Sequence, residues 1–187
     1  MLSTRRAVLV SCLLFPSTLS AAQGLFGGQT RCRRFSVPGA SFEHPDDWQQ
    51  ITVPPPIVAL FTKGQETSFT VNRDRIDFPQ VFNEDFAAYE TKSIPQGYPG
   101  ATTISAKPVV HPKLGQLLRI DFMKPGTPQG RDRRARQLQL RVFSIPGEAF
   151  VHRVTCAAPS DEFAKRYEPI FTRMFDSLVI TAPQVQK

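Results

Sequence analysis

The sequence is poor in the residue types that mark several protein classes. Its 187 residues include only three cysteines, three histidines and one tryptophan, which excludes a disulfide-rich scaffold. No apolar run reaches the ~18 residues that a membrane-spanning helix needs. His44, His111 and His152 show no ligand-type spacing, and neither a glycine-rich nucleotide loop nor an EF-hand pattern occurs. The sequence therefore predicts no metal site, no cofactor and no catalytic residue.

The residues that are abundant indicate a small aromatic globular domain. Apolar residues make up 41% and charged residues 21%, which is ordinary globular usage. Seventeen prolines, eleven glycines and fifteen phenylalanines predict short strands, many turns and an aromatic core. The formal net charge of +7 allows an anionic partner without requiring one. The length suits a single domain.

The first residues are typical of a secretory signal. Residues 1–22 begin with Arg5 and Arg6, continue with the apolar residues 7–15 and end in small residues before a cleavage point after Ala22. The apolar stretch is too short for an anchor helix. The sequence therefore predicts a periplasmic or secreted protein, and the paired arginines leave twin-arginine export open.

The rest of the chain divides into three parts. We expect residues 23–34 to be a flexible basic lead-in, residues 35–181 to form the single domain, and residues 182–187 to be a tail. After cleavage, Cys32 and Cys156 are the remaining cysteines. Because an exported chain enters an oxidising space, they are candidates for one disulfide. Two separate thiols are the alternative, and the sequence leaves both open.

The hydrophobic pattern predicts an α+β fold with the order β-β-β-α-β-β-β-β-α. We expect strands around 35–42 and at 57–62, 67–73, 102–110, 114–123, 135–145 and 149–156. We expect one amphipathic helix of about three turns, with Phe82, Phe86 and Tyr89 on its apolar face, which the prolines and glycines at 95–100 end. We expect a second helix from about residue 160, which Pro169 kinks or restarts. Both helices would pack on one antiparallel sheet, with Pro108 placing its strand at the edge. The predicted core residues are Trp48, Phe69, Phe86, Phe122, Phe163, Phe171 and Phe175.

Several local segments resemble the PsbP-like fold family, which includes the bacterial DcrB-like proteins. The segments are 42–48 (Phe-Glu-His-Pro-Asp-Asp-Trp), a hairpin at 59–71, the turn Pro146-Gly147 and 175–178 (Phe-Asp-Ser-Leu). The resemblance spans residues 35–181. It implies a non-enzymatic binding or assembly module. The photosystem II members of this family have calcium- or manganese-related roles, but no matching acidic cluster occurs here.

Polar side chains on the last three predicted strands form the first candidate binding surface. Strand alternation places them on one face if these strands are neighbours. The residues of this candidate surface are Arg119, Asp121, Gln139, Arg141 and Arg153. Arginine suits bidentate binding of carboxylate or phosphate, so the face could bind an anion or a partner. The alternative is a solvated sheet face crossed by Arg–Asp pairs.

A basic cluster at a predicted hairpin tip is the second candidate surface. It contains Arg131, Arg133, Arg134 and Arg136. Such a tip could contact acidic lipid headgroups, or it could simply be solvated. No aromatic residues are interleaved with these arginines, and export also argues against nucleic acid, so no nucleic-acid partner is expected.

We therefore expect an exported, non-catalytic binding or assembly protein. Its partner would be another envelope or extracellular protein, or an anionic surface. A secreted hydrolase and a carrier of a small ligand or metal are the alternatives, each with a site that the sequence does not reveal.

Overall fold

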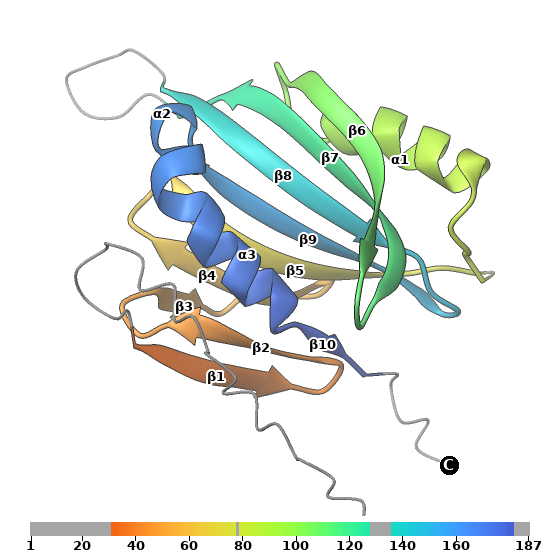
Figure 1. Ribbon diagram of the computed structural model, residues 1–187, viewed down its shortest axis with the longest axis horizontal. Helices are drawn as coiled ribbons and strands as arrows, with labels where there is room; N and C mark the ends of the chain where they lie inside the picture. Colours follow the sequence, from red (N-terminus) through yellow and green to blue (C-terminus); the bar gives the residue numbers. More distant parts are fainter. Residues whose placement is uncertain (1–30, 78, 128–135, 182–187) are drawn as a thin grey trace, which may run out of the picture.

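A seven-stranded antiparallel sheet forms the centre of the computed structural model, which describes residues 31–77, 79–127 and 136–181 (Figure 1). In spatial order its strands are β3 (Gln49–Ile51), β4 (Ile57–Lys63), β5 (Thr67–Arg75), β9 (Phe150–Pro159), β8 (Gln137–Ile145), β7 (Gly115–Pro125) and β6 (Thr102–His111). β6 lies at one edge, as the proline in its middle predicts.

The two faces of this sheet are covered by helices from different parts of the chain. Helix α1 (Glu84–Gln96) lies on one face, and its start is fixed by Asn83, whose side-chain oxygen accepts the Phe86 N–H at 2.8 Å. On the other face lie α2 (Ser160–Glu162), the π-helical turn η1 (Phe163–Tyr167) and α3 (Glu168–Asp176), as Figure 1 shows. The predicted α+β class, with helices packed on an antiparallel sheet, is confirmed.

The π-helical turn is explained by the proline that follows it. Pro169 has no N–H, so it cannot donate the helical bond that its position requires. Instead, the N–H of Glu168 reaches back to the carbonyl of Phe163, which widens the turn before α3 begins. Of the two outcomes predicted for Pro169, the structure shows the restart.

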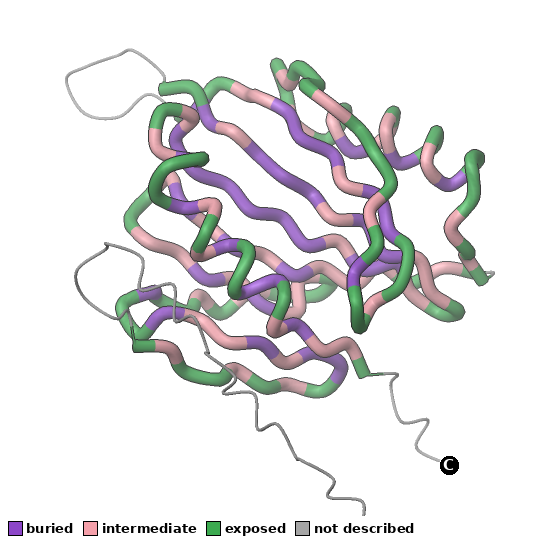
Figure 2. The backbone as a smooth tube through the Cα atoms, in the orientation of Figure 1, coloured by how far each residue is buried: buried purple, intermediate pink, exposed green. Residues whose placement is uncertain are grey.

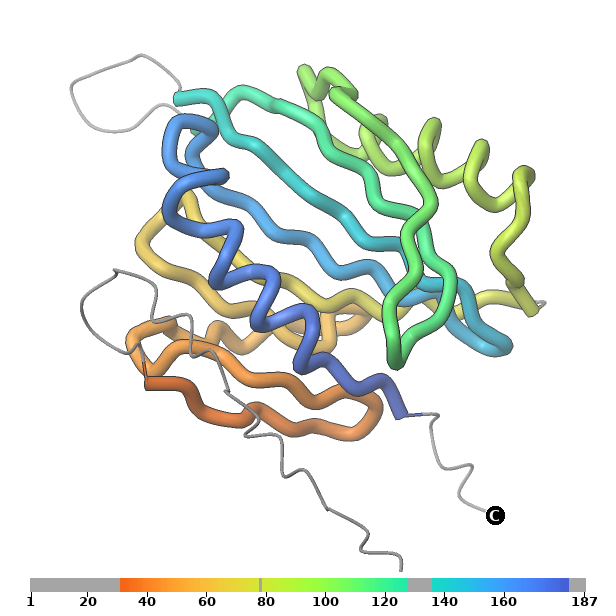
Figure 3. Tube along the Cα trace, in the orientation of Figure 1, coloured from red at the N-terminus to blue at the C-terminus, as the bar shows by residue number. Residues whose placement is uncertain are grey.

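A second, three-stranded sheet lies beside the first and differs from the predicted order. It contains β1 (Cys32–Val37), β2 (Ala40–Pro45) and β10 (Val179–Ile180), in the order β1-β2-β10 (Figure 3). The prediction of three strands before the first helix was wrong, because five precede it. The single extended element expected at 35–42 is a hairpin that turns at Gly39, where φ is +100°.

The strand β1 also corrects the boundary of the predicted flexible lead-in. It begins at Cys32, inside the segment 23–34, because its backbone pairs with β2 from Cys32↔Pro45 to Val37↔Ala40. The predicted signal segment 1–22 and the predicted tail 182–187 lie outside the described residues.

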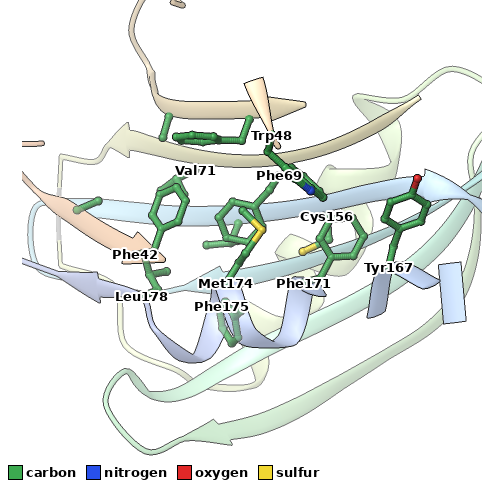
Figure 4. Close-up of a cluster of buried hydrophobic side chains, with 14 of the residues drawn as sticks. Phe42, Trp48, Phe69, Val71, Cys156, Tyr167, Phe171, Met174, Phe175 and Leu178 are labelled. Carbon is green, nitrogen blue, oxygen red and sulfur yellow. The ribbon is translucent and has the colours of Figure 1, made fainter. Parts of the chain in front are cut away.

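Two hydrophobic cores flank the large sheet, and the central strands are buried along most of their length (Figure 2). The core under the C-terminal helix contains Trp48, Phe69, Phe163, Phe171 and Phe175. Figure 4 shows side chains from α3 and from the strands pointing into this core. The core under α1 contains the other two predicted core residues, Phe86 and Phe122.

Helix α1 does not present the face that its pattern predicts. Phe86, Glu90 and Ile94, spaced four residues apart, are its buried residues, whereas Tyr89 is 66% exposed. The prediction that Tyr89 lies on the buried face of the helix was wrong. The residue next to it, Glu90, is buried instead, although it carries a carboxylate. The buried contact made by Glu90 is part of the site described below.

Candidate functional site

The first candidate surface requires strands β7, β8 and β9 to be neighbours, and they are. The pairing register, however, separates its members. Asp121 faces Arg141 across β7 and β8, whereas Arg141 faces Cys156 across β8 and β9. Arg153 faces Ser144, so it lies on the α1 side of the sheet. The expectation that Arg153 shares a face with Arg141 was wrong. The pairing of β9 with β8 places Cys156 and Val154 on the Arg141 side of the sheet, so Arg153 lies on the other side.

The face that carries the remaining members is not solvated. Arg141 is 7% exposed and Asp121 is 4% exposed, because the C-terminal helix covers this side of the sheet. Gln139 is half-buried on β8 beside them. The prediction that this face of the sheet is exposed to solvent is therefore wrong. Alternation identified correctly which β7 and β8 residues share a face, but it could not show that a helix covers the polar face as well.

The buried members form an ion-pair network that a residue of α3 completes. Arg141 donates through Nε to Asp121 Oδ1 at 2.7 Å and through a terminal nitrogen to Glu168 Oε1 at 2.6 Å. Arg119 donates through Nε to Asp121 Oδ2 at 2.8 Å. The Asp121 carboxylate thus joins two guanidinium groups, one on its own strand and one on the next.

The environment of Arg141 keeps it charged. Burial acts to lower its pKa, but the hydrogen bonds to Asp121 and Glu168 outweigh burial, and the pKa is raised. The guanidinium carbon also lies 5.3 Å from the centre of the Phe163 ring. Because Phe163 and Glu168 are at the two ends of the π-helical hydrogen bond, the widened turn positions both contacts of Arg141.

A cavity of about 260 Å³ adjoins this network, between α3 and the strands β6, β7 and β8. Its lining includes Arg119, Arg141, Glu168, Phe175 and Val110. Val110 is 80% exposed, and Arg119 keeps 24% of its side chain exposed, so the cavity opens to solvent at the sheet edge. Of the first candidate surface, Arg119 is therefore the member that a partner can reach through this cavity.

His111 also lines this cavity, but its ring is held by the turn between β6 and β7. Its Nδ1 accepts the backbone N–H groups of Lys113 and Leu114, each at 3.2 Å. Its Nε2 lies 3.8 Å from Asp176 Oδ1. Burial lowers the pKa of His111 despite the nearby carboxylate. A neutral ring that accepts two backbone hydrogen bonds stabilises the turn rather than transferring protons.

A second ion-pair network, centred on Arg153, lies on the opposite face. Arg153 donates to both carboxylate oxygens of Glu90, through Nε at 2.8 Å and through a terminal nitrogen at 2.6 Å. Its other terminal nitrogen contacts Asp74 of β5, and Ser144 Oγ donates to Glu90. The Glu90 hydrogen bond is the largest cause that raises the pKa of Arg153, against the effect of burial. This network fastens α1 to β5, β8 and β9.

Glu90 and Glu168 were not among the predicted site residues. A signal for Glu90 was present: it follows Phe86 by four residues and precedes Ile94 by four, so a carboxylate occupies the buried stripe of a helix. Such a carboxylate requires a buried cationic partner. Glu168 gave no such signal, because its position depends on the π-helical turn.

The second candidate surface is represented by one described residue. Arg136 lies just before β8 and donates to Asp161 at 2.7 Å and Glu162 at 2.9 Å. The two carboxylates therefore pair with the Arg136 guanidinium at the start of the C-terminal helical segment. Arg131, Arg133 and Arg134 lie outside the described residues.

The two cysteines of the candidate disulfide are not joined to each other. Cys156 is fully buried in β9, and Cys32 lies half-buried at the start of β1 in the other sheet. Burial raises the pKa of the Cys156 thiol far above its usual value. Of the two alternatives left by the sequence, the structure shows two separate cysteines.

No group of three or more His, Cys, Asp or Glu side chains in 31–77, 79–127 and 136–181 is arranged to hold a metal ion. Within the same ranges, no helix combines the length and the apolar character needed to cross a membrane.

The arrangement of strands and helices is the PsbP-like fold. The solution structure of cyanobacterial PsbP (CyanoP) from Synechocystis sp. PCC 6803 matches with a TM-score of 0.55 and 16% identity, covering 87% of this chain and 99% of that one. The crystal structure of LpqN from Mycobacterium tuberculosis, described as involved in cell envelope biogenesis, matches with a TM-score of 0.50 and 12% identity, covering 81% and 91%.

Other comparisons add a weaker likeness and two negative results. The Ran-binding protein Mog1p of Saccharomyces cerevisiae matches with a TM-score of 0.48 and 9% identity, covering 81% of this chain and 96% of that one. No protein-family model matches the sequence, and a comparison with curated proteins finds no relative. The predicted resemblance to the PsbP-like fold is confirmed by the structure of CyanoP.

Proposed function

We propose that this protein is an exported, non-catalytic accessory protein that binds an acidic segment of an envelope or extracellular partner protein. The binding surface is the opening of the α3-side cavity at the edge strand β6. Residues 1–22 supply the argument for export, since they have the composition of a secretory signal. The fold shared with LpqN, whose description concerns cell envelope biogenesis, is consistent with this compartment.

The observation that carries the proposal is the position of Lys107 beside Arg119. The two residues pair across β6 and β7, so their side chains leave the same face of the sheet. Lys107 is exposed, and Arg119 is partly exposed in the cavity. Val109, half-buried two residues further along the same strand, leaves the same face and lines the cavity. Two cations next to a half-buried apolar side chain suit a segment that carries carboxylates and an apolar residue.

The side chains best suited to catalysis have structural duties in this fold, which supports a binding role. The Cys156 thiol is buried and its pKa is raised, so it supplies no thiolate. The His111 ring accepts backbone hydrogen bonds. Arg141 and Asp121 neutralise each other beneath the cavity and present a rigid floor rather than a free acid and base.

Capture from the native envelope fraction with the tagged chain tests this proposal. The test variant is Lys107→Glu, and the matched control is Lys92→Glu, the same charge reversal at an exposed position on α1. We expect a partner that the wild type and Lys92→Glu retain and Lys107→Glu loses, and a peptide copy of the acidic segment of that partner should compete for binding. Equal capture by both variants, or no partner for the wild type, would overturn the proposal.

A further inference from the structure

A groove runs between α1 and the sheet on the face opposite the α3-side cavity. It consists of two adjoining cavities, of about 270 and 580 Å³, and Tyr89 and Arg153 line both of them. Small-molecule sites commonly occupy roughly 300–1,000 Å³, so a groove of this size can hold a compound of one or two rings. The proposed partner surface lies on the other side of the sheet, so a ligand here would bind independently of it.

Unpaired polar atoms are concentrated in the smaller cavity. Across the described part of the chain, four buried side-chain atoms have no hydrogen-bond partner. Two of the four, Asn72 Oδ1 and Ser93 Oγ, belong to residues that line this cavity. They come from opposite walls, β5 and α1, and Thr155 of β9 adds a further hydroxyl between them. Buried polar atoms require partners, and a ligand with both donors and acceptors would supply them.

The charge in the smaller cavity is already paired, which argues for an uncharged ligand there. Arg153 is the only charged residue among those lining the smaller cavity, and Glu90 and Asp74 hold it. Glu90 is 1% exposed, so an incoming anion would have to displace a buried carboxylate. A neutral ligand can use the remaining hydrogen-bonding positions without breaking this network.

Two tyrosines supply an aromatic wall. Tyr89 lies largely exposed on α1, where it lines both cavities, and Tyr98 lines the smaller one. The Tyr98 ring is fixed in place by Phe122, whose ring centre is 5.0 Å away. Tyrosine combines an apolar ring face with a polar hydroxyl. It therefore suits a ligand that has C–H groups on one side and hydroxyl groups around its rim.

From these four features we infer that the groove between α1 and strands β5 and β9 binds an uncharged, hydroxyl-rich ring compound of the sugar class. The ring would lie against Tyr89. Its hydroxyls would bond to Asn72, Ser93 and Thr155 in the smaller cavity. The larger cavity, which Asp74 and Gln80 help to line, gives room for a second ring.

Nuclear magnetic resonance titration of the purified chain tests this inference. The probes are glucose, N-acetylglucosamine and maltose, with glucuronate as the charged counterpart of glucose. We expect saturable shifts at Asn72, Tyr89 and Ser93 with at least one neutral sugar, and weaker binding of glucuronate. The double variant Tyr89→Ala/Ser93→Ala should weaken binding by about tenfold, whereas Lys92→Ala, at an exposed residue of the same helix that lines neither cavity, should leave it unchanged.

Three results would overturn the inference: no saturable shift with any of the neutral sugars, shifts that map elsewhere, or equal binding by the double variant and the wild type. Each would mean that this groove does not bind these sugars. Backbone amide spectra of both variants report whether the fold is retained. Since Tyr89 is exposed and Ser93 Oγ has no hydrogen-bond partner in the structure, the double variant is expected to fold.

Discussion

Arg141 Nε lies 2.7 Å from Asp121 Oδ1, in a part of the sheet that the C-terminal helix covers. The pair joins the middles of two neighbouring strands, and Glu168 and Arg119 extend it to α3 and along β7. Removal of Arg141 leaves the buried Asp121 carboxylate with Arg119 in place of two guanidinium partners, and takes the Arg141 contact from Glu168.

We therefore expect Arg141→Ala to lower the free energy of unfolding by about 3–5 kcal/mol. Urea unfolding followed by circular dichroism measures this change. The double variant Asp121→Leu/Arg141→Leu should recover much of the loss, because it removes both charges together. A loss below about 1 kcal/mol for the single variant would mean that Arg119 compensates the Asp121 charge without Arg141.

The network on the other face predicts a local effect. Glu90→Ala removes the carboxylate that holds α1 against Arg153 and Ser144. We expect α1 to exchange its amide hydrogens faster than in the wild type while α3 keeps its protection. Hydrogen exchange read by mass spectrometry separates the two helices. The control is Tyr89→Ala, an exposed change on the same helix, and equal exchange in α1 for both variants would contradict the role given to Glu90.

Trp48 provides a test of the core under α3. Its ring is buried and meets the Phe171 ring edge-on, with the centres 5.8 Å apart. Trp48→Ala should therefore destabilise the protein by about 3–5 kcal/mol. Thermal and urea unfolding report the change, with Val81→Ala at an exposed site as the neutral control. A difference of less than about 0.5 kcal/mol between the two variants would place Trp48 outside the cooperative core.

His152 predicts a loss of stability in mild acid. Burial, helped by the charge of Arg73, lowers its pKa from 6.5 to about 4. The unfolded chain therefore binds a proton at a higher pH than the folded chain does. The stabilisation is complete above pH 6.5 and is lost as the pH falls towards 4, by up to about 3 kcal/mol. Unfolding measured across this range should show the slope, and His152→Leu should reduce it. An unchanged slope in the variant would assign it to other groups.

Cys156 should be protected from alkylation while the protein is folded. Its side chain is buried, so a reagent cannot reach the sulfur, and its raised pKa keeps the thiol protonated. We expect iodoacetamide to label Cys156 only after unfolding, as judged by mass spectrometry of the peptides. Rapid labelling in the native state would indicate that β9 opens locally.

Local pattern predicts the strands and their edges, whereas the site depends on relations between strands. The alternation in β7 and β8 correctly separates Leu118 and Leu140 from Asp121 and Arg141. The same alternation does not give the register between β8 and β9. A change of that register by one residue would move Arg153 to the other face of the sheet. The side of the sheet that a residue occupies in β9 depends on pairing with distant segments, which alternation within β9 does not record.

The remaining differences also have local causes. The strand β3 has three residues and β10 has two, so neither is long enough to show a periodic pattern. The cations of the candidate site could be proposed from their residue type, but Glu168 reaches Arg141 only because the helix widens before Pro169. Glu90 could have been recognised, since it stands on the buried stripe of its helix.

The small sheet sets the order in which the chain can complete its fold. Its central strand, β2, is made early in synthesis, but one of its two neighbours is β10, which pairs through Val179↔Ser41 and Ile180↔Ala40. The ribosome therefore releases almost the whole chain before β2 has both partners. Contacts so distant in sequence form slowly. Under the proposed export, this delay would leave the small sheet incomplete while the first residues are already at the membrane.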